Sequence, residues 1–135
     1  MNHLRYEGDC SENLITHSVR FYVCKLCKPF HFDIITYTFN LGLVPSAWKT
    51  ARVIACKVVH DTRFAAPKHE NVTIKEYDNI HSKLYLMKND QGKIVDAYIG
   101  SYNFNTPGRF KDIIYKVRKN DYRNMHEYFE SLWRQ

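Results

Sequence analysis

The stretch FDIITYTF, residues 32–39, constrains the fold of this chain more than any other segment. Its β-branched and aromatic residues favour a strand, and its small number of polar residues indicates that both faces of this strand are buried. A strand buried on both faces requires a layer packed against each side of its sheet. The stretch therefore predicts a sheet covered by helices, which is an α/β fold.

Five further segments have the composition of strands, and Asn-Asp-Gln-Gly at residues 89–92 predicts a hairpin turn between two of them. The expected strands cover residues 52–60, 72–77, 82–88, 93–100 and 111–118. No internal repeat or linker divides the sequence. We therefore expect one domain with a mixed β-sheet over residues 11–135, after an irregular N-terminal segment at residues 1–10.

Apolar residues at helical spacing predict helices near both ends of this domain. Ser11 is the expected cap of the first helix, which runs through residues 12–27 and ends before Pro29. A short helix is expected over residues 43–50. Asp121 is the expected cap of the last helix. The core stripe of that last helix consists of Met125, Phe129, Leu132 and Trp133.

The composition is that of a globular, basic protein. Of the 135 residues, 44% are hydrophobic, which excludes a disordered chain, and the formal net charge is +6. A basic surplus favours an anionic partner, of which nucleic acid is the first candidate; a basic surface that only aids solubility is the alternative. No apolar run approaches the roughly 20 residues that a membrane-spanning helix needs, so we expect no membrane association.

The first residues and the cysteines predict a cytoplasmic location. The opening sequence MNHLRYEGDC is too polar for a secretory signal. The four cysteines, Cys10, Cys24, Cys27 and Cys56, are too few and too irregularly spaced for a disulfide framework. We therefore expect packed thiols in a reducing cytoplasm.

Two short motifs hold the polar residues from which we predict a function. In HSKLYLM, His81 and Lys83 are two residues apart, and residues two apart in a strand point to the same face. In GSYNF, Ser101 and Asn103 have the same spacing, and Gly100 permits close approach of a ligand to the backbone. If the hairpin turn folds the two strands together, the four side chains converge. An imidazole can then attack phosphorus while an ammonium and an amide hold the phosphate oxygens.

These motifs resemble the half-motif (the HKD motif) of the phospholipase D superfamily, His-x-Lys followed by Gly-Ser-x-Asn. They are similar to those of its small bacterial and phage nucleases and of related domains in some restriction enzymes and helicases. The similarity extends over about residues 10–135, and its specific part covers residues 79–104. The resemblance implies a phospholipase D-like fold and a hydrolase, a phosphodiesterase or endonuclease acting on nucleic acid. It favours DNA over RNA and requires neither a metal nor another cofactor.

The resemblance also implies an assembly and a mechanism. Family members usually carry two copies of the motif, and the small nucleases with one copy form homodimers around a two-fold axis. This chain has one copy, so we expect a homodimer in which two copies of His81 face each other. One His81 attacks phosphorus, the other protonates the leaving oxygen, and Lys83, Asn103 and Ser101 hold the phosphate. The family places after the Asn a carboxylate that orients a histidine, and Asp112 is the candidate.

Lys88 departs from the family pattern, because the family usually has an Asp five residues after the Lys of the motif. A catalytically silent module that binds nucleic acid or a protein partner is therefore the alternative function. A lipid phosphodiesterase is a third hypothesis, but the chain lacks a membrane-seeking amphipathic helix. Outside the motifs, Arg63 and Lys68 lie in a basic loop that could contact a nucleic-acid backbone. Tyr37 and Phe39 either border the site or pack in the core, and core packing is favoured.

Overall fold

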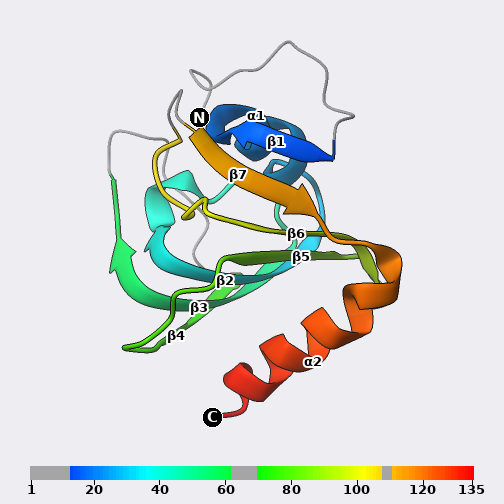
Figure 1. Ribbon diagram of the computed structural model, residues 1–135. Helices are drawn as coiled ribbons and strands as arrows, with labels where there is room; N and C mark the ends of the chain where they lie inside the picture. The colour runs from blue at the N-terminus through cyan, green and yellow to red at the C-terminus, as the bar shows by residue number, and fades with distance from the viewer. Residues whose placement is uncertain (1–12, 62–69, 108–110) are drawn as a thin grey trace.

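Within residues 13–61, 70–107 and 111–135, which the computed structural model describes, seven strands form one mixed sheet (Figure 1). Their order across the sheet is β1-β7-β6-β5-β2-β3-β4. The strands β2, β3 and β4 run parallel, and every other neighbouring pair is antiparallel. The bounds are β1 Leu14–His17, β2 His31–Asn40, β3 Thr50–Val59, β4 Val72–Glu76, β5 Leu84–Lys88, β6 Ile94–Gly100 and β7 Lys111–Lys116.

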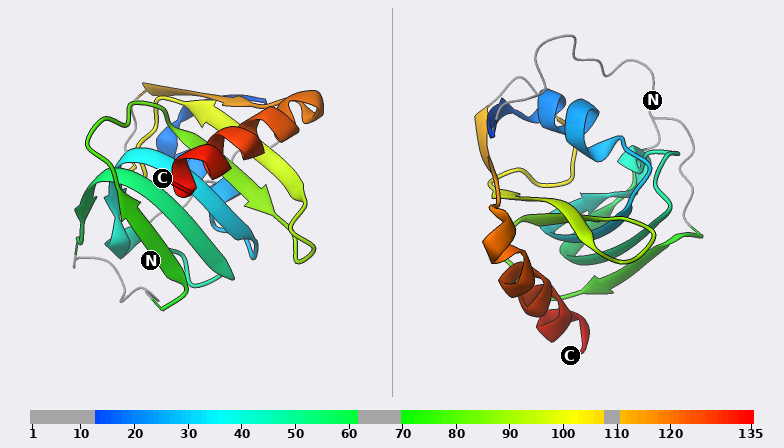
Figure 2. Two further views of the ribbon diagram at one scale, coloured as in Figure 1. Left: turned by 90° about the horizontal axis from the view of Figure 1, so that it is seen from below. Right: turned by 90° about the vertical axis from the view of Figure 1, so that its right-hand side faces the viewer.

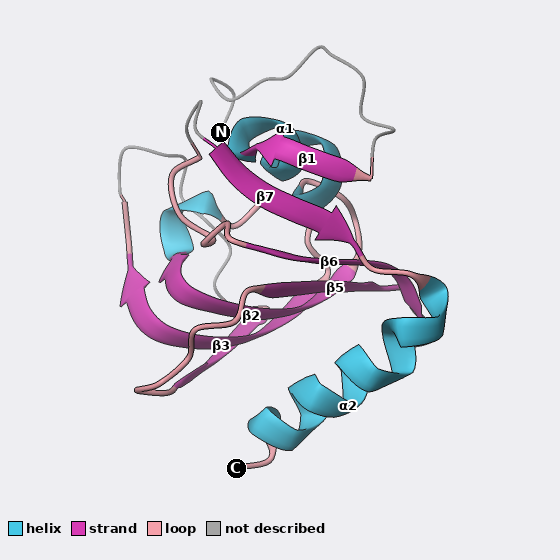
Figure 3. Cartoon of the chain, viewed as in Figure 1, coloured by secondary structure: helices cyan, strands magenta, loops and turns pink. Residues whose placement is uncertain are grey.

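The sheet carries a helical layer on each face, which confirms the α/β class (Figure 2). On one face, α1 (Ser18–Phe21) continues into a π-helical turn, η1 (Tyr22–Leu26). On the opposite face, α2 (Tyr122–Trp133) lies across the strands and carries the C-terminus (Figure 3). Two short 3-10 turns, η2 (Leu41–Leu43) and η3 (Lys119–Asp121), complete the helical elements of the described residues.

Two apolar clusters, one on each face of the sheet, form the core. Phe21 of α1 packs onto three tyrosine rings in edge-to-face geometry. Its ring centroid lies 5.2, 5.1 and 5.9 Å from those of Tyr85, Tyr98 and Tyr102. Under α2, the fully buried Phe129 packs among apolar residues of the central strands. The remaining residues of the expected stripe, Met125, Leu132 and Trp133, are partly buried against the same cluster. The prediction for this helix is therefore confirmed.

The central strand and the hairpin form as the sequence predicts. Residues 32–36 of β2 are each at most 4% exposed, because β2 is paired on both edges and covered on both faces. The hairpin turn between β5 and β6 closes with an N–H of Gly92 that donates to the carbonyl of Asn89 at 2.9 Å. Gly92 has a φ of 78°, which other residues rarely adopt, so the glycine fixes this turn.

Two local predictions were wrong, and a third holds in part. The expected helix over residues 12–27 is helical only from Ser18 onward, because Leu14–His17 pairs with β7 and adds an edge strand. The expected short helix over residues 43–50 is replaced by the turn η2 and an irregular segment, which Trp48 anchors by donating from Nε1 to the Leu26 carbonyl at 2.7 Å. Asp121 is the N-cap residue of α2, as expected, but its side chain makes no capping hydrogen bond. The expected cap Ser11 lies outside the described residues.

The cysteines differ in part from the expectation of packed thiols. Cys27 and Cys56 are free thiols, whereas Cys24 is disulfide-bonded. Burial raises the pKa of the Cys27 thiol, so this side chain is an uncharged core residue. In the described part of the chain, α2 and the shorter helical turns lack the length and apolar character of a bilayer-crossing helix.

Candidate active site

Both motifs lie at the end of the sheet where β2 and β6 finish. β6 ends at Gly100, whose N–H donates to the carbonyl of Lys83 at 3.3 Å. Lys83 and His81 precede β5, and the antiparallel β2–β5 ladder ends one residue after Lys83. The β5–β6 hairpin therefore places His-x-Lys beside Gly-Ser-x-Asn, next to the end of β2.

Asn103 is held in place by its side-chain oxygen. Oδ1 accepts hydrogen bonds from the N–H groups of Tyr37 and Thr38 at 3.0 and 3.2 Å, and from Oγ1 of Thr36 at 3.1 Å. Because two of the donors are backbone N–H groups, the accepting atom must be oxygen, and this fixes the orientation of the amide. Within the described residues no protein acceptor engages Nδ2. This NH₂ group is therefore available to donate to a phosphate oxygen.

Ser101 and Asp112 form a fixed pair across β6 and β7. Ser101 Oγ donates to Asp112 Oδ1 at 2.8 Å and accepts from the N–H of Ile113 at 3.0 Å. The N–H of Ser101 also donates to the carbonyl of Ile113 at 2.9 Å. The Ser101 hydroxyl therefore holds the Asp112 carboxylate at the start of β7, next to the Asn103 amide.

Two buried tyrosines hold the loop that carries these residues. Tyr85 donates from its hydroxyl to the carbonyl of Tyr102 at 2.6 Å, and Tyr102 donates to the carbonyl of Asn105 at 2.7 Å. Burial raises the pKa of both phenols well above the ordinary value, so they remain neutral donors. The loop thus has a fixed shape although it belongs to no helix or strand.

The structure explains why position 100 is a glycine, which the sequence alone does not reveal. A Cβ at this position would lie 1.9 Å from the carbonyl oxygen of Ile113, so the glycine lets β7 approach β6. From the sequence we expected a ligand to lie against the backbone of Gly100, whereas in the structure the backbone of β7 lies there.

A hollow of about 310 Å³ opens at this end of the sheet. Among the predicted site residues, Ser101, Asn103 and Asp112 line it. His81 and Lys83 lie at the same sheet end but are not part of this lining. His81 is exposed, and the Lys83 ammonium donates to the carbonyl of His81 at 3.1 Å. One chain therefore presents a polar hollow at the same end of the sheet as an exposed imidazole and a lysine, and no histidine of the described residues lines the hollow.

Lys88 lies at the opposite end of β5 and takes part in a charge network that stabilises the sheet. Its Nζ is 2.5 Å from Asp33 Oδ2, and the two side chains are 10% and 5% exposed. Asp33 also accepts two hydrogen bonds from Arg52, at 2.9 and 2.8 Å, and Arg52 pairs with Glu130 of α2 at 2.7 Å. These contacts, the bond to Asp33 first, raise the pKa of the Arg52 guanidinium. Lys88 therefore stands among structural charges, away from the His-x-Lys end of the strand.

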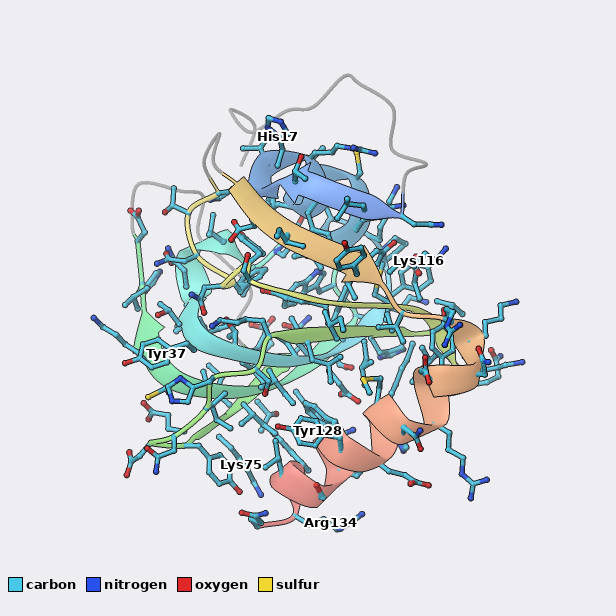
Figure 4. The ribbon with its side chains drawn as sticks, in the orientation of Figure 1. His17, Tyr37, Lys75, Lys116, Tyr128 and Arg134 are labelled. Atoms are coloured by element: carbon cyan, nitrogen blue, oxygen red, sulfur yellow. The ribbon has the colours of Figure 1, made fainter. Side chains whose placement is uncertain are left out.

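The sequence did not reveal the part that the end of β2 has in the site. Thr36 and the backbone of residues 37–38 orient Asn103, although more than sixty positions separate them in the chain. Tyr37, labelled in Figure 4, is 40% exposed and its N–H donates to Asn103, so the expectation of core packing was wrong for it. Phe39 is fully buried, as expected. The predicted contacts Arg63 and Lys68 lie outside the described residues.

Comparisons with known proteins bear on the family and the fold of this chain. Residues 33–135 match the family described as the NgoFVII restriction endonuclease N-terminal PLD domain, where PLD denotes phospholipase D. No curated protein matches the chain. Three chains of solved structures match it, and one of them is the polyphosphate kinase from Porphyromonas gingivalis, with a TM-score of 0.57 and 11% identity.

The match to the kinase shows a shared fold only. It covers 88% of this chain and 23% of the kinase chain, so this protein spans about a quarter of the length of that neighbour. The family match covers most of the chain, including both motifs, the end of β2 and α2. The fold, the sheet end that gathers the motifs, and this match show that the chain belongs to the NgoFVII-type family of phospholipase D domains.

Proposed function

We propose that this protein is a phosphodiesterase that cleaves nucleic acid, DNA in preference to RNA, through a covalent phosphohistidine on His81. The observation that carries the proposal is the fixed amide of Asn103, which lines the hollow at the sheet end and whose Nδ2 has no acceptor among the described residues. His81 and Lys83 lie at the same end of the sheet, outside that lining. The family name, which refers to a restriction endonuclease, supports DNA as the substrate.

One chain holds only half of the groups that the reaction needs, which supports an active site shared by two chains. A phosphodiester cleavage through an imidazole needs a nucleophile on one side of phosphorus and an acid on the other. Among the described residues no histidine lines the hollow of one chain, and the sequence has one His-x-Lys. A second copy of the chain supplies the second His81 if the two hollows meet across a two-fold axis.

The steps of the proposed reaction balance as follows. Nε2 or Nδ1 of one His81 forms a bond to phosphorus, and the P–O bond to the leaving strand breaks as the second His81 gives its proton to that oxygen. The second imidazole then takes a proton from water, whose oxygen displaces the first imidazole from phosphorus. The ammonium of Lys83 and the amide of Asn103 hold the non-bridging oxygens as their negative charge grows. Ser101 keeps Asp112 in position to orient a histidine.

A cleavage assay in excess chelator tests this proposal. Plasmid DNA, single-stranded DNA and RNA are incubated with the wild-type protein, with His81→Ala and with His31→Ala. His31 is the matched control, because it lies at the opposite end of β2 and pairs with the exposed Asp90. We expect cleavage by the wild type and by His31→Ala, and a loss of about 1,000-fold or more in His81→Ala.

Two outcomes contradict the proposal. Cleavage that survives His81→Ala assigns the chemistry to another group. Salt-sensitive binding without cleavage by the wild type identifies the protein as a silent nucleic-acid-binding module instead.

A further inference from the structure

A second hollow, of about 680 Å³, lies at the other end of the β5–β6 hairpin. It lies between the hairpin turn, the start of β6 and the first turns of α2. Its cationic or polar lining consists of Asn89, Lys93, Lys119, Arg123 and His126, and its apolar lining includes Val95 and Tyr122. We call this hollow the basic cleft. Within the described residues no carboxylate lines it.

The cations of the basic cleft are free to meet an anion from solution. Lys93, Lys119 and Arg123 are exposed, and Arg123 has only a surface contact with Glu127 at 3.1 Å, with exposures of 89% and 60%. Such an exposed pair is worth little and is easily exchanged for another anion. Lys93 and Lys119 have no carboxylate within salt-bridge distance in the described part of the chain.

His126 contributes a ring N–H donor to this cleft. The ammonium of Lys88 lies 3.2 Å from its Nδ1, and an ammonium can only donate, so Nδ1 accepts and Nε2 carries the proton. Lys88 is itself held by Asp33 at 2.5 Å, which makes this arrangement rigid. The buried charge network thus orients one donor of the cleft.

The cleft has the mixed chemistry that a nucleotide unit presents. Phosphate oxygens suit the lysines and Arg123, while the exposed Val95 and the ring of Tyr122 offer apolar surface to a sugar or base. Its volume lies within the range of ordinary ligand sites. β6 separates the cleft from the Gly100 end of the sheet by six residue steps, or about 20 Å.

We propose that the basic cleft is a second nucleic-acid contact, which binds the phosphate backbone of the same strand or duplex whose phosphodiester lies at the His81 end. This inference rests on the proposed function, since it assumes a polymeric substrate at the catalytic end. A second contact about 20 Å away makes affinity depend on the length of the nucleic acid, because a dinucleotide cannot reach both places.

Binding measurements on an uncleaving protein test the proposal. The cleft variant, Lys119→Gln/Arg123→Gln, and a control variant, Lys28→Gln/Arg134→Gln, are both made in the His81→Ala protein. The control removes the same charge from exposed positions elsewhere, and Arg134 lies at the far end of α2 (Figure 4). Fluorescence anisotropy is recorded for a labelled dinucleotide and for an oligonucleotide of about twelve residues, over a range of salt concentrations.

We expect the cleft variant to bind the long oligonucleotide about tenfold more weakly. The slope of the logarithm of the binding constant against the logarithm of the salt concentration should be smaller in magnitude by about 1.4, as the loss of two phosphate contacts requires. Its affinity for the dinucleotide and the affinity of the control variant for either ligand stay unchanged. Equal losses in both variants, or an equal loss for the dinucleotide, would indicate only a general charge effect and overturn the proposal. Binding of ATP that the wild type shows and the cleft variant loses would likewise overturn it in favour of a free nucleotide.

Cleavage separates this inference from the proposed function. With wild-type His81 restored, the cleft variant should cleave a small substrate such as bis(p-nitrophenyl) phosphate at the wild-type rate and long DNA less efficiently, through a higher KM. Failure of the wild type to cleave either substrate refutes the proposed catalysis. A length-independent affinity refutes the second contact.

Discussion

Lys88 is predicted to stabilise the fold and to have no part in the reaction, although it occupies the position where related domains usually carry an Asp. Its Nζ lies 2.5 Å from a carboxylate that is 5% exposed, and at this depth an ion pair is costly to break. In Lys88→Met, Asp33 loses one of two cations but keeps the double hydrogen bond from Arg52. We expect a loss of about 2 kcal/mol in the free energy of unfolding, the worth of one charged hydrogen bond.

Lys88→Asp is a harsher change, because it places a second carboxylate against Asp33. The loss of the pair and the added repulsion predict a cost of about 4 kcal/mol or more, a large fraction of the stability of an ordinary domain. The variant that restores the usual family residue is therefore expected to be the less stable of the two.

Urea unfolding followed by circular dichroism measures both variants. The midpoint of Lys88→Met should fall by about 1 M, with Lys57→Met as the control at an exposed lysine of β3. Cleavage of bis(p-nitrophenyl) phosphate per folded molecule should stay at the wild-type level, since Lys88 lies at the opposite end of β5 from the motif and this substrate is too small to reach the basic cleft. Wild-type stability in Lys88→Met, or a higher cleavage rate in a folded Lys88→Asp, would refute this reasoning.

Three other changes test further contacts. Asn103→Asp keeps an oxygen for the three donors from β2 but replaces the NH₂ group by a second oxygen. We therefore expect little change in melting temperature and a fall of about 100-fold or more in kcat. A large drop in melting temperature would contradict the assigned orientation of the amide. Gly100→Ala places a methyl group against the Ile113 carbonyl and should cost about 1–3 kcal/mol in unfolding free energy, measured by urea titration; an unchanged midpoint would show that β7 can move away. The pKa of Glu130 is lowered, chiefly by its hydrogen bond from Arg52. This pair therefore stabilises the fold at pH values above the unfolded pKa of about 4.5, and its contribution is lost as the pH falls through the lower pKa of the folded state. The stability difference between the wild type and Glu130→Gln should therefore be constant near neutral pH and shrink in acid, and a difference that is independent of pH would be evidence against the pair.

The fold was predictable where local sequence determines local structure. The β-branched run of β2, the glycine of the hairpin turn and the apolar stripe of α2 each specify their element through short-range preferences. The edge strand β1 was not predictable, because its pairing with β7 involves residues about one hundred positions away and overrides the local helical spacing.

The candidate site shows the same division. The combination of the two motifs and their resemblance to a known family named His81, Lys83, Ser101 and Asn103 as candidates. The hairpin turn explains why the backbones of Lys83 and Gly100 meet. The orientation of Asn103 depends on the end of β2, and the partner of Lys88 is Asp33, fifty-five positions away. Neither contact leaves a pattern in the sequence, since each results from strand order and register.

The covalent intermediate tests the shared site most directly. The protein is mixed with an excess of labelled DNA in chelator, quenched in denaturant within a fraction of a turnover, and analysed by intact and peptide mass spectrometry. A phosphoramidate (P–N) bond that joins the DNA to the imidazole of His81, at no more than one adduct for every two chains, is the expected result, because two imidazoles serve one phosphorus atom. An adduct on another residue, one adduct on every chain, or cleavage without any adduct would contradict a single site built around two copies of His81.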